Sequence, residues 1–563
     1  MFERRLRGFL FLLLIVAAVL MARLADLQVL RADYFRQQAA DAELRDAQSL
    51  PFVRGSILDR TGRVLARDEP SWELRLDYAV LPSRDDELGP AVMSRDGELA
   101  QAIMEGAHEP WKALVRRCLE QNRYEDCATA KEVEFALRGE LNRMWNELAD
   151  FASLPRSDLE ERAHKKRKRI LQQQFDVAKA HGYVVTLAEQ TRPGSREHAI
   201  LTGLDNQQQI DARRAFADYP WVSVKGETRR VYPGGESLVH IAGRMGAVSA
   251  ETLESDPNKT DSLRRYLGRD RWGVRGVERA AEDQLRGRRG SLQLDRQGEI
   301  IQEISPERGR DVTLTLRLDL QQRLYSEFGS MLEPPSVSGA IVVLHVPTRE
   351  VLAMVSYPGY DPERFSVDYN DLVSDTVNLR LHFRAVGHQF APGSIVKPLT
   401  CLAGLGSGVI TPETRFNCVG RLFADLPDRW RCWGISGTNR RKAHGSVNVV
   451  EALAGSCNVF HYQVGEAVGF NSLVQFFAMA GFGDQTVIGL VENRSRVNRW
   501  ASDLIQRAVP LTAGKARHLG IGQGALSITP MQAANLVAVY ASGSHRPVTL
   551  IRSEQPTPEL VLP

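Results

Sequence analysis

The segment APGSIVKPLT, Ala391–Thr400, carries the residues that decide the fold and the chemistry of this chain. Ser394 and Lys397 stand three positions apart, which on a helix places the hydroxyl and the amine on one face, one turn apart. A serine alcohol is a weak nucleophile at neutral pH, but a lysine of depressed pKa can activate it as a base. Pro392 and Gly393 suit a tight turn before the helix, whose N-terminal N–H groups would lie beside the serine. The segment predicts an activated serine, and taken alone it also fits the start of a surface helix.

A second motif is needed to relay the proton and to orient an acyl substrate. The chain contains two Ser-x-Asn triplets, which begin at Ser446 and Ser456. Ser446 can cap the helix that follows it, which favours a structural role for the first triplet. Ser456-Cys457-Asn458 directly follows an apolar helical stretch, and we predict that Ser456 and Asn458 are the functional pair. Without context, Asn458 is also consistent with a helix-end or turn residue, and Cys457 is expected to pack rather than to react.

Longer strings around these motifs resemble the class B penicillin-binding proteins, the membrane-anchored peptidoglycan D,D-transpeptidases. The strings occur in the order and spacing of that family. Within it, HGSVNVVEALAGSCNVFHYQVG is most similar to the elongation-type subgroup called penicillin-binding protein 2, and the division type is the close alternative. The other strings that carry the resemblance are RGSILDRTGRVLA (54–66), RRVYPGGESLVHIAG (229–243), GVERAAEDQLRGRRG (276–290), GAIVVLHVPTREVLAMVSYPGYDP (339–362) and IGQGALSITPMQAA (521–534).

The resemblance implies an α+β transpeptidase domain shared with serine β-lactamases. In this family Ser394 would attack the penultimate D-Ala carbonyl of a stem peptide, and Lys397 would accept the serine proton. Ser456 would pass that proton toward the leaving amine, and Asn458 would hydrogen-bond the donor amide. β-Lactams would react at the same serine, and no metal or organic cofactor is required. The family further implies a glycosyltransferase of the SEDS type as a partner.

One family feature is missing from this sequence. The family carries a third box, Lys-Thr/Ser-Gly, tens of residues after the ITP element, and this chain contains no such triplet. Gly514-Lys515-Ala516 lacks the hydroxyl, precedes GIGQG and is predicted to be a loop. The sequence therefore indicates either a truncated record or a degenerate, non-catalytic member. Two alternative functions stay open: a scaffold that regulates a cell-wall glycosyltransferase, and a membrane-bound β-lactam sensor or hydrolase.

The chain divides into an anchor, a pedestal and a catalytic part. We assign residues 1–30 to a cytoplasmic tail and membrane anchor, 31–305 to the pedestal (dimerisation-type) domain, and 311–563 to the transpeptidase domain, incomplete at its C-terminus. Long charged stretches with apolar residues near 3.6 spacing predict a helical insertion in the pedestal at about residues 85–182. Further predictions are a hairpin with its turn at Thr61-Gly62, a strand running into a helix after residue 310, and two strands joined at Pro347-Thr348.

The N-terminal residues predict a single membrane span. Arg4, Arg5 and Arg7 precede an uncharged run from Gly8 to Ala22, and flanking arginines can extend so short an apolar helix by snorkelling. A cleaved signal peptide is the alternative, although no clear cleavage site follows. Basic residues before the run place the N-terminus in the cytoplasm and the catalytic part outside the bacterial inner membrane, in the periplasm.

Composition limits the remaining functional classes. The formal net charge is only +3, which leaves no excess of positive charge for a nucleic-acid partner. Six cysteines in 563 residues are too few for a disulfide-built scaffold, and no Cys-x-x-Cys pair suggests a zinc site. Cys418 and Cys432 lie outside the membrane and close a short loop, so a disulfide between them is predicted; free buried thiols are the alternative.

Overall fold

The structure is a computed structural model of the 563-residue chain. Its compact parts form two units: residues 68–230 make up one, and the residues before and after that range make up the other. The structure describes residues 21, 48–77, 130–166, 168, 197–219, 221–268, 270–294, 299–331, 338–426, 429–435, 443–482, 487–488, 490, 513–524, 526–552 and 560–561.

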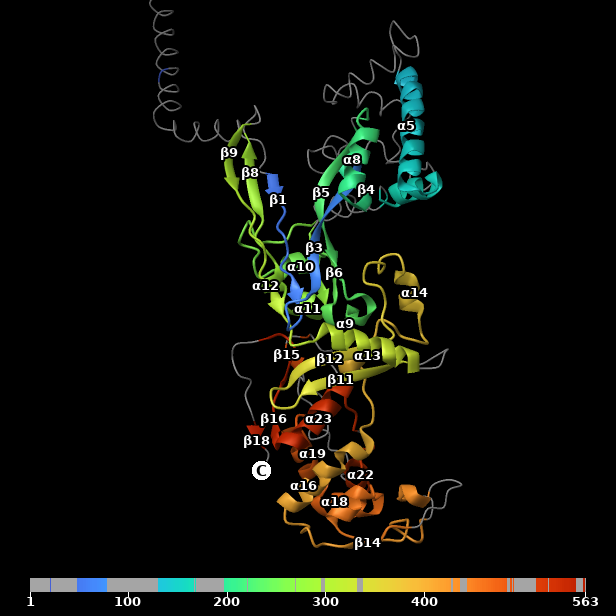
Figure 1. The fold of residues 1–563 in the computed structure, drawn as a ribbon, viewed down its shortest axis with the longest axis vertical. Coiled ribbons are helices and arrows are strands. Elements are labelled where there is room, and N and C mark those ends of the chain that lie inside the picture. Colours follow the sequence, from blue (N-terminus) through green and yellow to red (C-terminus); the bar gives the residue numbers. More distant parts are fainter. Residues whose placement is uncertain are drawn as a thin grey trace, which may run out of the picture. The chain divides into compact units, whose positions relative to one another are not determined.

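The unit of residues 68–230 combines a small antiparallel sheet with helices (Figure 1). From Trp72 onward β3 pairs antiparallel with β4, and β5 also pairs with β3. Asp205 caps α8 in a reciprocal capping box with Gln208, which explains where that helix begins. The elements are β3 (Val64–Asp77), α5 (Ala130–Ala152), β4 (Glu197–Leu204), α8 (Asn206–Ala215) and β5 (Val222–Val231).

The core of this unit confirms helical structure where a helical insertion is predicted. Met144, Trp145 and Leu148 recur on one face of α5 and are buried against Leu74 and Trp221. Residues 156–166 are helical as well. The remaining residues of the predicted insertion lie outside the described part of the chain, so its predicted bounds stay a prediction.

The pedestal part of the other unit consists of short strands and helices. β2 and β3 form the predicted hairpin, with Ile57 opposite Ala66 and a positive φ of 88° at Gly62 in the turn. The elements are β1 (Gln48–Leu50), β2 (Ile57–Leu58), η3 (Gly235–Ser237), α9 (Val239–Ala242), β6 (Arg244–Ala247), α10 (Ala250–Glu254), β7 (Arg271–Arg275), α11 (Gly276–Ala280), α12 (Glu282–Leu285), β8 (Gly290–Leu294) and β9 (Ile300–Ile304).

A buried ion-pair network connects two of the strings that carry the family resemblance. Arg54 Nε donates to Glu278 Oε2 at 2.7 Å, and Arg54 Nη2 donates to Glu282 Oε2 at 2.7 Å. Arg54 is 4% exposed and Glu278 is fully buried. Because buried charges are tolerated only when they are paired and hydrogen-bonded, this arginine fixes the segment before β2 to α11 and α12.

We expect Arg54→Ala to lower the free energy of unfolding by about 3–5 kcal/mol, because it removes the guanidinium that faces two buried carboxylates. Urea unfolding followed by circular dichroism measures the effect. Arg288→Ala is the matched control: its pair with Glu307 is exposed, and its loss should cost no more than about 1 kcal/mol. Equal, small shifts for both variants would contradict a structural role for the Arg54 network.

The catalytic part of the same unit contains a sheet with strand order β11-β12-β17-β15 and a group of helices. β11 and β12 form the predicted hairpin, and β10 is followed by α13, as predicted for a strand running into a helix. The elements are β10 (Val312–Thr313), α13 (Leu318–Met331), β11 (Gly339–His345), β12 (Glu350–Tyr357), α14 (Tyr369–Ser374), α15 (Arg384–Gly387), η4 (Gly393–Val396), α16 (Lys397–Gly406), β13 (Phe416–Cys418), η5 (Trp433–Ile435), β14 (Gly445–Val447), α17 (Val449–Ala454), α18 (Asn458–Val468), α19 (Phe470–Met479), β15 (Val487–Ile488), α22 (Ala513–Gly520), α23 (Pro530–Ser542), β16 (Ser544–His545), β17 (Val548–Thr549) and β18 (Leu560–Val561).

Helices α16, α18 and α22 pack together around an apolar core (Figure 1). Two glycines let α18 and α22 approach closely. A Cβ atom on Gly465 would lie 2.8 Å from the Ala516 carbonyl oxygen, and one on Gly520 would lie 2.8 Å from the His461 carbonyl oxygen. The close contact fixes α18, at whose N-terminus the Ser456-Cys457-Asn458 triplet lies.

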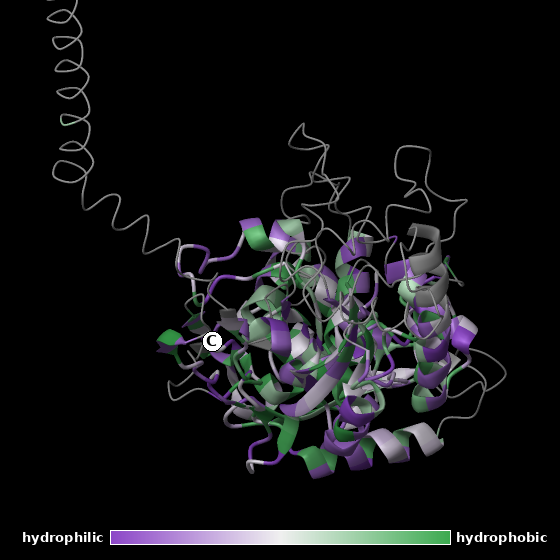
Figure 2. Cartoon of the chain, turned by 90° about the horizontal axis from the view of Figure 1, so that it is seen from above, coloured by the Kyte–Doolittle hydropathy of each residue, from purple (hydrophilic) through white to green (hydrophobic). Residues whose placement is uncertain are grey.

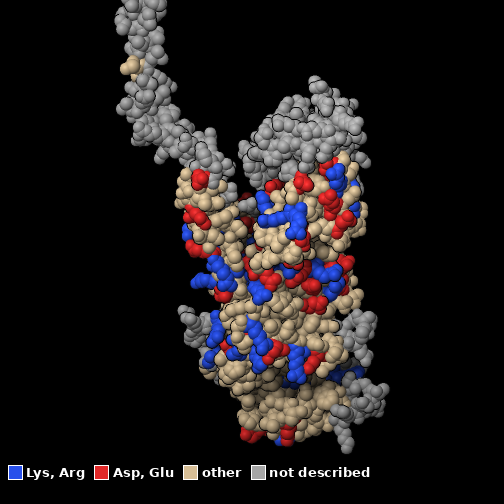
Figure 3. Space-filling view, turned by 45° about the horizontal axis from the view of Figure 1, so that its top comes forward, with Lys and Arg blue, Asp and Glu red and all other residues tan. Residues whose placement is uncertain are grey.

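The surface of the chain shows the pattern expected of amphipathic elements. Figure 2 shows hydrophilic and hydrophobic residues on the same helices. On the face that Figure 3 shows, basic and acidic side chains are interspersed, so that face has no field of a single sign.

Among the described residues, no helix combines the length and the apolar character that a membrane span requires. The anchor predicted in residues 1–30 lies outside the described residues, apart from Met21.

Candidate active site

The predicted nucleophile lies in a tight turn that two hydrogen bonds and the close approach of a glycine hold in place. Ser394 belongs to the 3₁₀ helix η4, and not to the α-helix that the sequence predicted; Gly393 before it has a φ of +62°. Gly393 N–H donates to the Gly522 carbonyl at 2.9 Å, and a Cβ atom on Gly522 would clash with the Gly393 carbonyl at 2.1 Å. The Tyr540 hydroxyl donates to the Ile395 carbonyl at 2.8 Å. The turn therefore depends on Gly522, the first glycine of the IGQG string.

Lys397 begins α16 directly after this turn and is 2% exposed. Its Nζ donates to the Ser456 carbonyl at 2.8 Å, to Ser456 Oγ at 2.9 Å and to Asn458 Oδ1 at 2.6 Å. Burial, which penalises the charged form, lowers the pKa of Lys397 to about 8. A lysine with this pKa has an appreciable neutral fraction near neutral pH, which a general base requires.

Ser456 connects the lysine to the nucleophile. Its Oγ lies 2.9 Å from Lys397 Nζ and donates to Ser394 Oγ at 3.2 Å. The backbone of Ser456 has a φ of +49°, a left-handed conformation that residues with a side chain rarely adopt. Such backbone strain persists only where the surrounding structure determines it, and it clusters at functional sites. The conformation lets the carbonyl and the hydroxyl of one residue face Lys397 together.

Asn458 is the first residue of α18, after Cys457 as N-cap. Besides accepting from Lys397, its Nδ2 donates to the Arg431 carbonyl at 3.2 Å. His461, one turn later, has a pKa lowered to about 4 by burial, and its Nδ1 lies 2.7 Å from the Cys457 carbonyl. A neutral imidazole therefore donates to that carbonyl and holds the first turn of the helix.

These groups face a cavity of about 370 Å³. The structure thus brings together all four residues that the sequence predicted for the site, and Ser394, Ser456 and Asn458 lie in the cavity wall. Sequence reasoning did not identify Trp433, Ile521 and Gln523, whose side chains or backbone complete the lining. The IGQG string was the only signal for the last two.

We expect acylation of Ser394 to accelerate with pH, because only the neutral Lys397 amine can accept a proton. With a pKa of about 8, the rate should rise close to tenfold per pH unit below about pH 7 and level off above about pH 9. The second-order rate of labelling by a fluorescent penicillin, measured at constant ionic strength, tests this. A rate that is flat across this range would show that another group accepts the proton.

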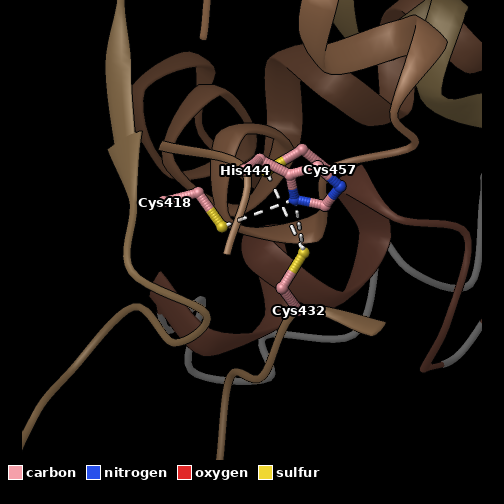
Figure 4. Close-up of side chains that lie close together, drawn as sticks. All are labelled: Cys418, Cys432, His444 and Cys457. Atoms are coloured by element: carbon pink, nitrogen blue, oxygen red, sulfur yellow. Dashed lines mark hydrogen bonds between the residues drawn. The ribbon is translucent and has the colours of Figure 1, made fainter. Parts of the chain in front are cut away.

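A second group of side chains includes the middle residue of the Ser456-Cys457-Asn458 triplet (Figure 4). We call Cys418, Cys432, His444 and Cys457 the cysteine-histidine cluster. Their ligand atoms all lie within 4.8 Å of one another, and the three cysteines are buried. His444 Nδ1 lies 3.6 Å from Cys418 Sγ and 3.4 Å from Cys432 Sγ, and the Cys432 and Cys457 sulfurs are 4.0 Å apart.

The donor set of this cluster fits a soft divalent metal. Three thiols and one imidazole are a common ligand set of structural Zn²⁺, and a tetrahedron with Zn–S distances near 2.3 Å places sulfurs about 3.7 Å apart. The spacing of the ligand atoms agrees with this geometry. The sequence did not indicate a metal site, because residues 418, 432, 444 and 457 contain no close cysteine pair. The predicted disulfide between Cys418 and Cys432 is not formed in the structure, where both thiols are free.

Two further sequence predictions need correction. In the first Ser-x-Asn triplet, Asn448 rather than Ser446 caps the following helix, in a capping box with Glu451. Ser446 instead lies in β14. The stretch Gly514-Lys515-Ala516 is not a loop, since it lies in the helix α22.

Two family descriptions match consecutive parts of the chain. Residues 50–314 match the Penicillin-binding Protein dimerisation domain, and residues 339–561 match the Penicillin binding protein transpeptidase domain. The chain belongs to the class B penicillin-binding proteins. Its α+β architecture is accordingly the two-domain fold of this family, with a pedestal and a transpeptidase domain.

Named relatives and solved structures show what this penicillin-binding protein is similar to. The peptidoglycan D,D-transpeptidase MrdA of Escherichia coli K12 is 33% identical over 337 residues, which cover 57% of this chain and 50% of MrdA. The chain thus spans about half the length of the curated relatives it matches. A Helicobacter pylori complex of PBP2 with MreC has a TM-score of 0.63 at 18% identity, covering 91% of this chain and 79% of that chain. A structure described as a peptidoglycan synthase complex that coordinates polymerization and crosslinking has a TM-score of 0.57 at 22% identity, covering 99% and 82%.

Proposed function

We propose that this protein is a peptidoglycan D,D-transpeptidase that cross-links stem peptides through an acyl-enzyme on Ser394. The observation that carries the proposal is the position of Ser456 Oγ, which lies 3.2 Å from Ser394 Oγ and 2.9 Å from Lys397 Nζ at an open cavity. This is the arrangement of an activated nucleophile, a relay and a base. The similarity to MrdA supports the same activity.

The geometry accounts for both halves of the reaction. Ser394 Oγ attacks the penultimate D-Ala carbonyl, while its proton moves to Ser456 Oγ and the Ser456 proton moves to neutral Lys397 Nζ. The proton returns along this path to the nitrogen of the terminal D-Ala, which leaves as the peptide bond breaks. The amine of a neighbouring stem peptide then attacks the carbonyl carbon of the Ser394 ester. Its proton passes through Lys397 and Ser456 to Ser394 Oγ as the ester bond breaks, which releases the cross-linked product and restores the free serine. β-Lactams acylate Ser394 by opening their ring in the first of these steps.

Asn458 has a double role in this proposal. Its Oδ1 accepts from Lys397, which holds the amine toward Ser456. Its Nδ2 has two hydrogens, and the Arg431 carbonyl accepts one of them. The second hydrogen is available to a substrate amide carbonyl in the adjoining cavity, as the family resemblance implies for this residue.

We further propose that the protein is a single-pass protein of the bacterial inner membrane with its catalytic part in the periplasm. The basic residues before the apolar run at Gly8–Ala22 support this orientation. A glycosyltransferase of the SEDS type is the proposed partner, and elongation of the cell wall the proposed process. The peptidoglycan synthase complex and the PBP2–MreC complex among the similar structures support an assembly of this kind.

The test uses the full-length protein in detergent with uncross-linked glycan strands that carry pentapeptide stems. We expect release of D-alanine together with cross-linked dimers, and inhibition of both by penicillin. D-Alanine release without cross-links would favour a carboxypeptidase or hydrolase. Absence of both products while a glycosyltransferase partner is stimulated would favour the scaffold alternative.

A further inference from the structure

The carbonyl of Ile395, the residue after Ser394, cannot form the next hydrogen bond of the 3₁₀ turn. In such a turn each carbonyl accepts from the N–H three residues later, and Lys397 N–H donates to the Ser394 carbonyl in this way. The next carbonyl in the series is that of Ile395, and the residue three positions later is Pro398. Proline has no backbone N–H. The series of 3₁₀ hydrogen bonds therefore stops one residue after the nucleophile.

A side chain from a distant helix supplies the missing donor. The Tyr540 hydroxyl donates to the Ile395 carbonyl at 2.8 Å, and Tyr540 lies in α23, 145 residues further along the chain. Burial raises the pKa of Tyr540, and a hydrogen bond from the Leu399 backbone only partly opposes this rise. The phenol therefore stays protonated at neutral pH and remains a donor. Its oxygen connects the carbonyl before α16 with the backbone in the first turn of that helix.

Helix α23 is itself fixed to the segment that contains the nucleophile. It begins with a reciprocal capping box. Ile528, which lies just before this cap, exchanges two backbone hydrogen bonds of 2.9 Å with Phe390. Tyr540 packs against the same apolar core as α16 and α18. A tyrosine placed in this way has little freedom to follow a moving turn, so its hydroxyl defines one position for the Ile395 carbonyl.

The three attachments of the nucleophile turn differ in kind. Those at Phe390 and Gly393 join backbone groups and hold the chain before Ser394. The bond from Tyr540 holds the chain after Ser394, and of the three it alone uses a side chain. Removing the Tyr540 hydroxyl would therefore leave the entry to the turn in place and let the peptide after Ser394 rotate.

We propose that Tyr540 is a positioning residue for Ser394: it supplies the hydrogen bond that Pro398 cannot, and it thereby keeps Ser394 Oγ 3.2 Å from Ser456 Oγ. The inference rests on the proposed function, because its effect is on acylation of Ser394. Tyr540 is absent from the described lining of the cavity, so it acts through the turn and not on the substrate. Small displacements of a reacting group are enough to slow an enzyme strongly.

The experiment compares the full-length wild-type protein with Tyr540→Phe, which removes the hydroxyl and keeps the ring. Tyr266→Phe is the matched control: Tyr266 is 7% exposed, and its hydroxyl donates to Glu282 Oε1 at 2.7 Å in the pedestal. Acylation by a fluorescent penicillin is followed at increasing concentrations up to saturation. This separates the first-order acylation rate from the half-saturating concentration. Circular dichroism monitors folding.

We expect Tyr540→Phe to lower the saturating acylation rate about tenfold, the usual effect of one lost hydrogen bond. The half-saturating concentration should stay nearly the same, because the residues that line the cavity are intact. Tyr266→Phe should be acylated at the wild-type rate. A Tyr540→Phe variant with the wild-type saturating rate would overturn the proposal, and so would a variant in which only the half-saturating concentration changes.

A second substitution tests the hydrogen bond itself. Pro398→Ala introduces a backbone N–H at the position whose 3₁₀ acceptor is the Ile395 carbonyl. Combined with Tyr540→Phe, it should restore most of the lost acylation rate, because the backbone then supplies the donor. A double variant as slow as Tyr540→Phe would refute the Ile395 carbonyl as the group through which Tyr540 acts, and with it the positioning role.

The remaining outcomes also decide the question. If Tyr540→Phe does not fold, the double variant is measured in its place: acylation near the wild-type rate supports the proposal, and slow acylation contradicts it. If neither variant folds, the hydroxyl supports the fold as a whole and the positioning role is refuted. A wild-type protein that penicillin does not label at Ser394 would refute the proposed function and this inference together. A labelled wild type with an unaffected Tyr540→Phe refutes the inference alone.

Discussion

Replacing Ser394 with alanine is expected to abolish covalent labelling of the full-length protein by a fluorescent penicillin. The variant lacks the oxygen that forms the acyl ester, and the hydroxyl of Ser394 is the one that accepts from Ser456 Oγ at the cavity wall. Loss of a serine nucleophile costs on the order of a millionfold in rate where it has been measured. Gel fluorescence and mass mapping of the labelled peptide give the result.

Ser446→Ala is the matched control, because Ser446 belongs to the other Ser-x-Asn triplet and lies in β14, where its Oγ accepts from Arg415 Nε at 3.3 Å. We expect this variant to be labelled at the wild-type rate. Labelling that survives Ser394→Ala, at whatever residue, would refute the assignment of the nucleophile and with it the proposed mechanism.

The local parts of the fold could be predicted from the sequence. The turn at Thr61-Gly62 and the turn at Pro347-Thr348 each join two strands, as predicted, because glycine permits a positive φ and proline fixes φ, and both residues are visible in the sequence. The apolar spacing in α5 likewise matches its buried face. Such features depend on neighbours in the chain.

Errors occurred where tertiary contacts decide the local structure. Ser394 lies in a 3₁₀ turn because the Gly393 N–H donates a hydrogen bond to the carbonyl of Gly522, a residue far along the chain. The left-handed backbone of Ser456 places its carbonyl and its hydroxyl beside Lys397, and no propensity of serine predicts it. The pairing of Arg54 with Glu278 could not be predicted either, because the sequence around each residue does not indicate which residue it contacts.

The candidate site likewise contains residues that the sequence motifs identify and residues that only the tertiary fold brings together. Ser394, Lys397, Ser456 and Asn458 could be assigned because their spacing resembles a known family. The cysteine-histidine cluster could not, because its ligands come from β13, the segment before η5, the segment before β14 and the start of α18. Metal sites assembled from four separated segments have no sequence spacing to detect. The disulfide prediction failed for a related reason. Cys418 and Cys432 do not form an isolated pair in the structure, because His444 and Cys457 lie within the same group of side chains.

Lys397→Ala is expected to slow acylation of Ser394 by about a hundredfold to ten-thousandfold, the usual contribution of a general base. The fold should persist, because Ser456 and Asn458 are also held by the helix α18 and by the contacts of Arg431 and His461. Lys397→Arg should not restore the rate, since a guanidinium stays protonated at any accessible pH and cannot accept the serine proton. Penicillin labelling followed over hours measures the residual rates.

The pH profile separates a base from a merely structural cation at this position. If Lys397 accepts the proton with a pKa lowered to about 8 by burial, the rise of the rate with pH must disappear in Lys397→Ala, because the group that titrates has been removed. Lys515→Ala, which changes a lysine in α22 outside the site, should retain both the rate and the profile. A slowed Lys397→Ala that still accelerates with pH as wild type does would mean that Lys397 only supports Ser456 and Asn458 through its hydrogen bonds, and that a different group activates Ser394.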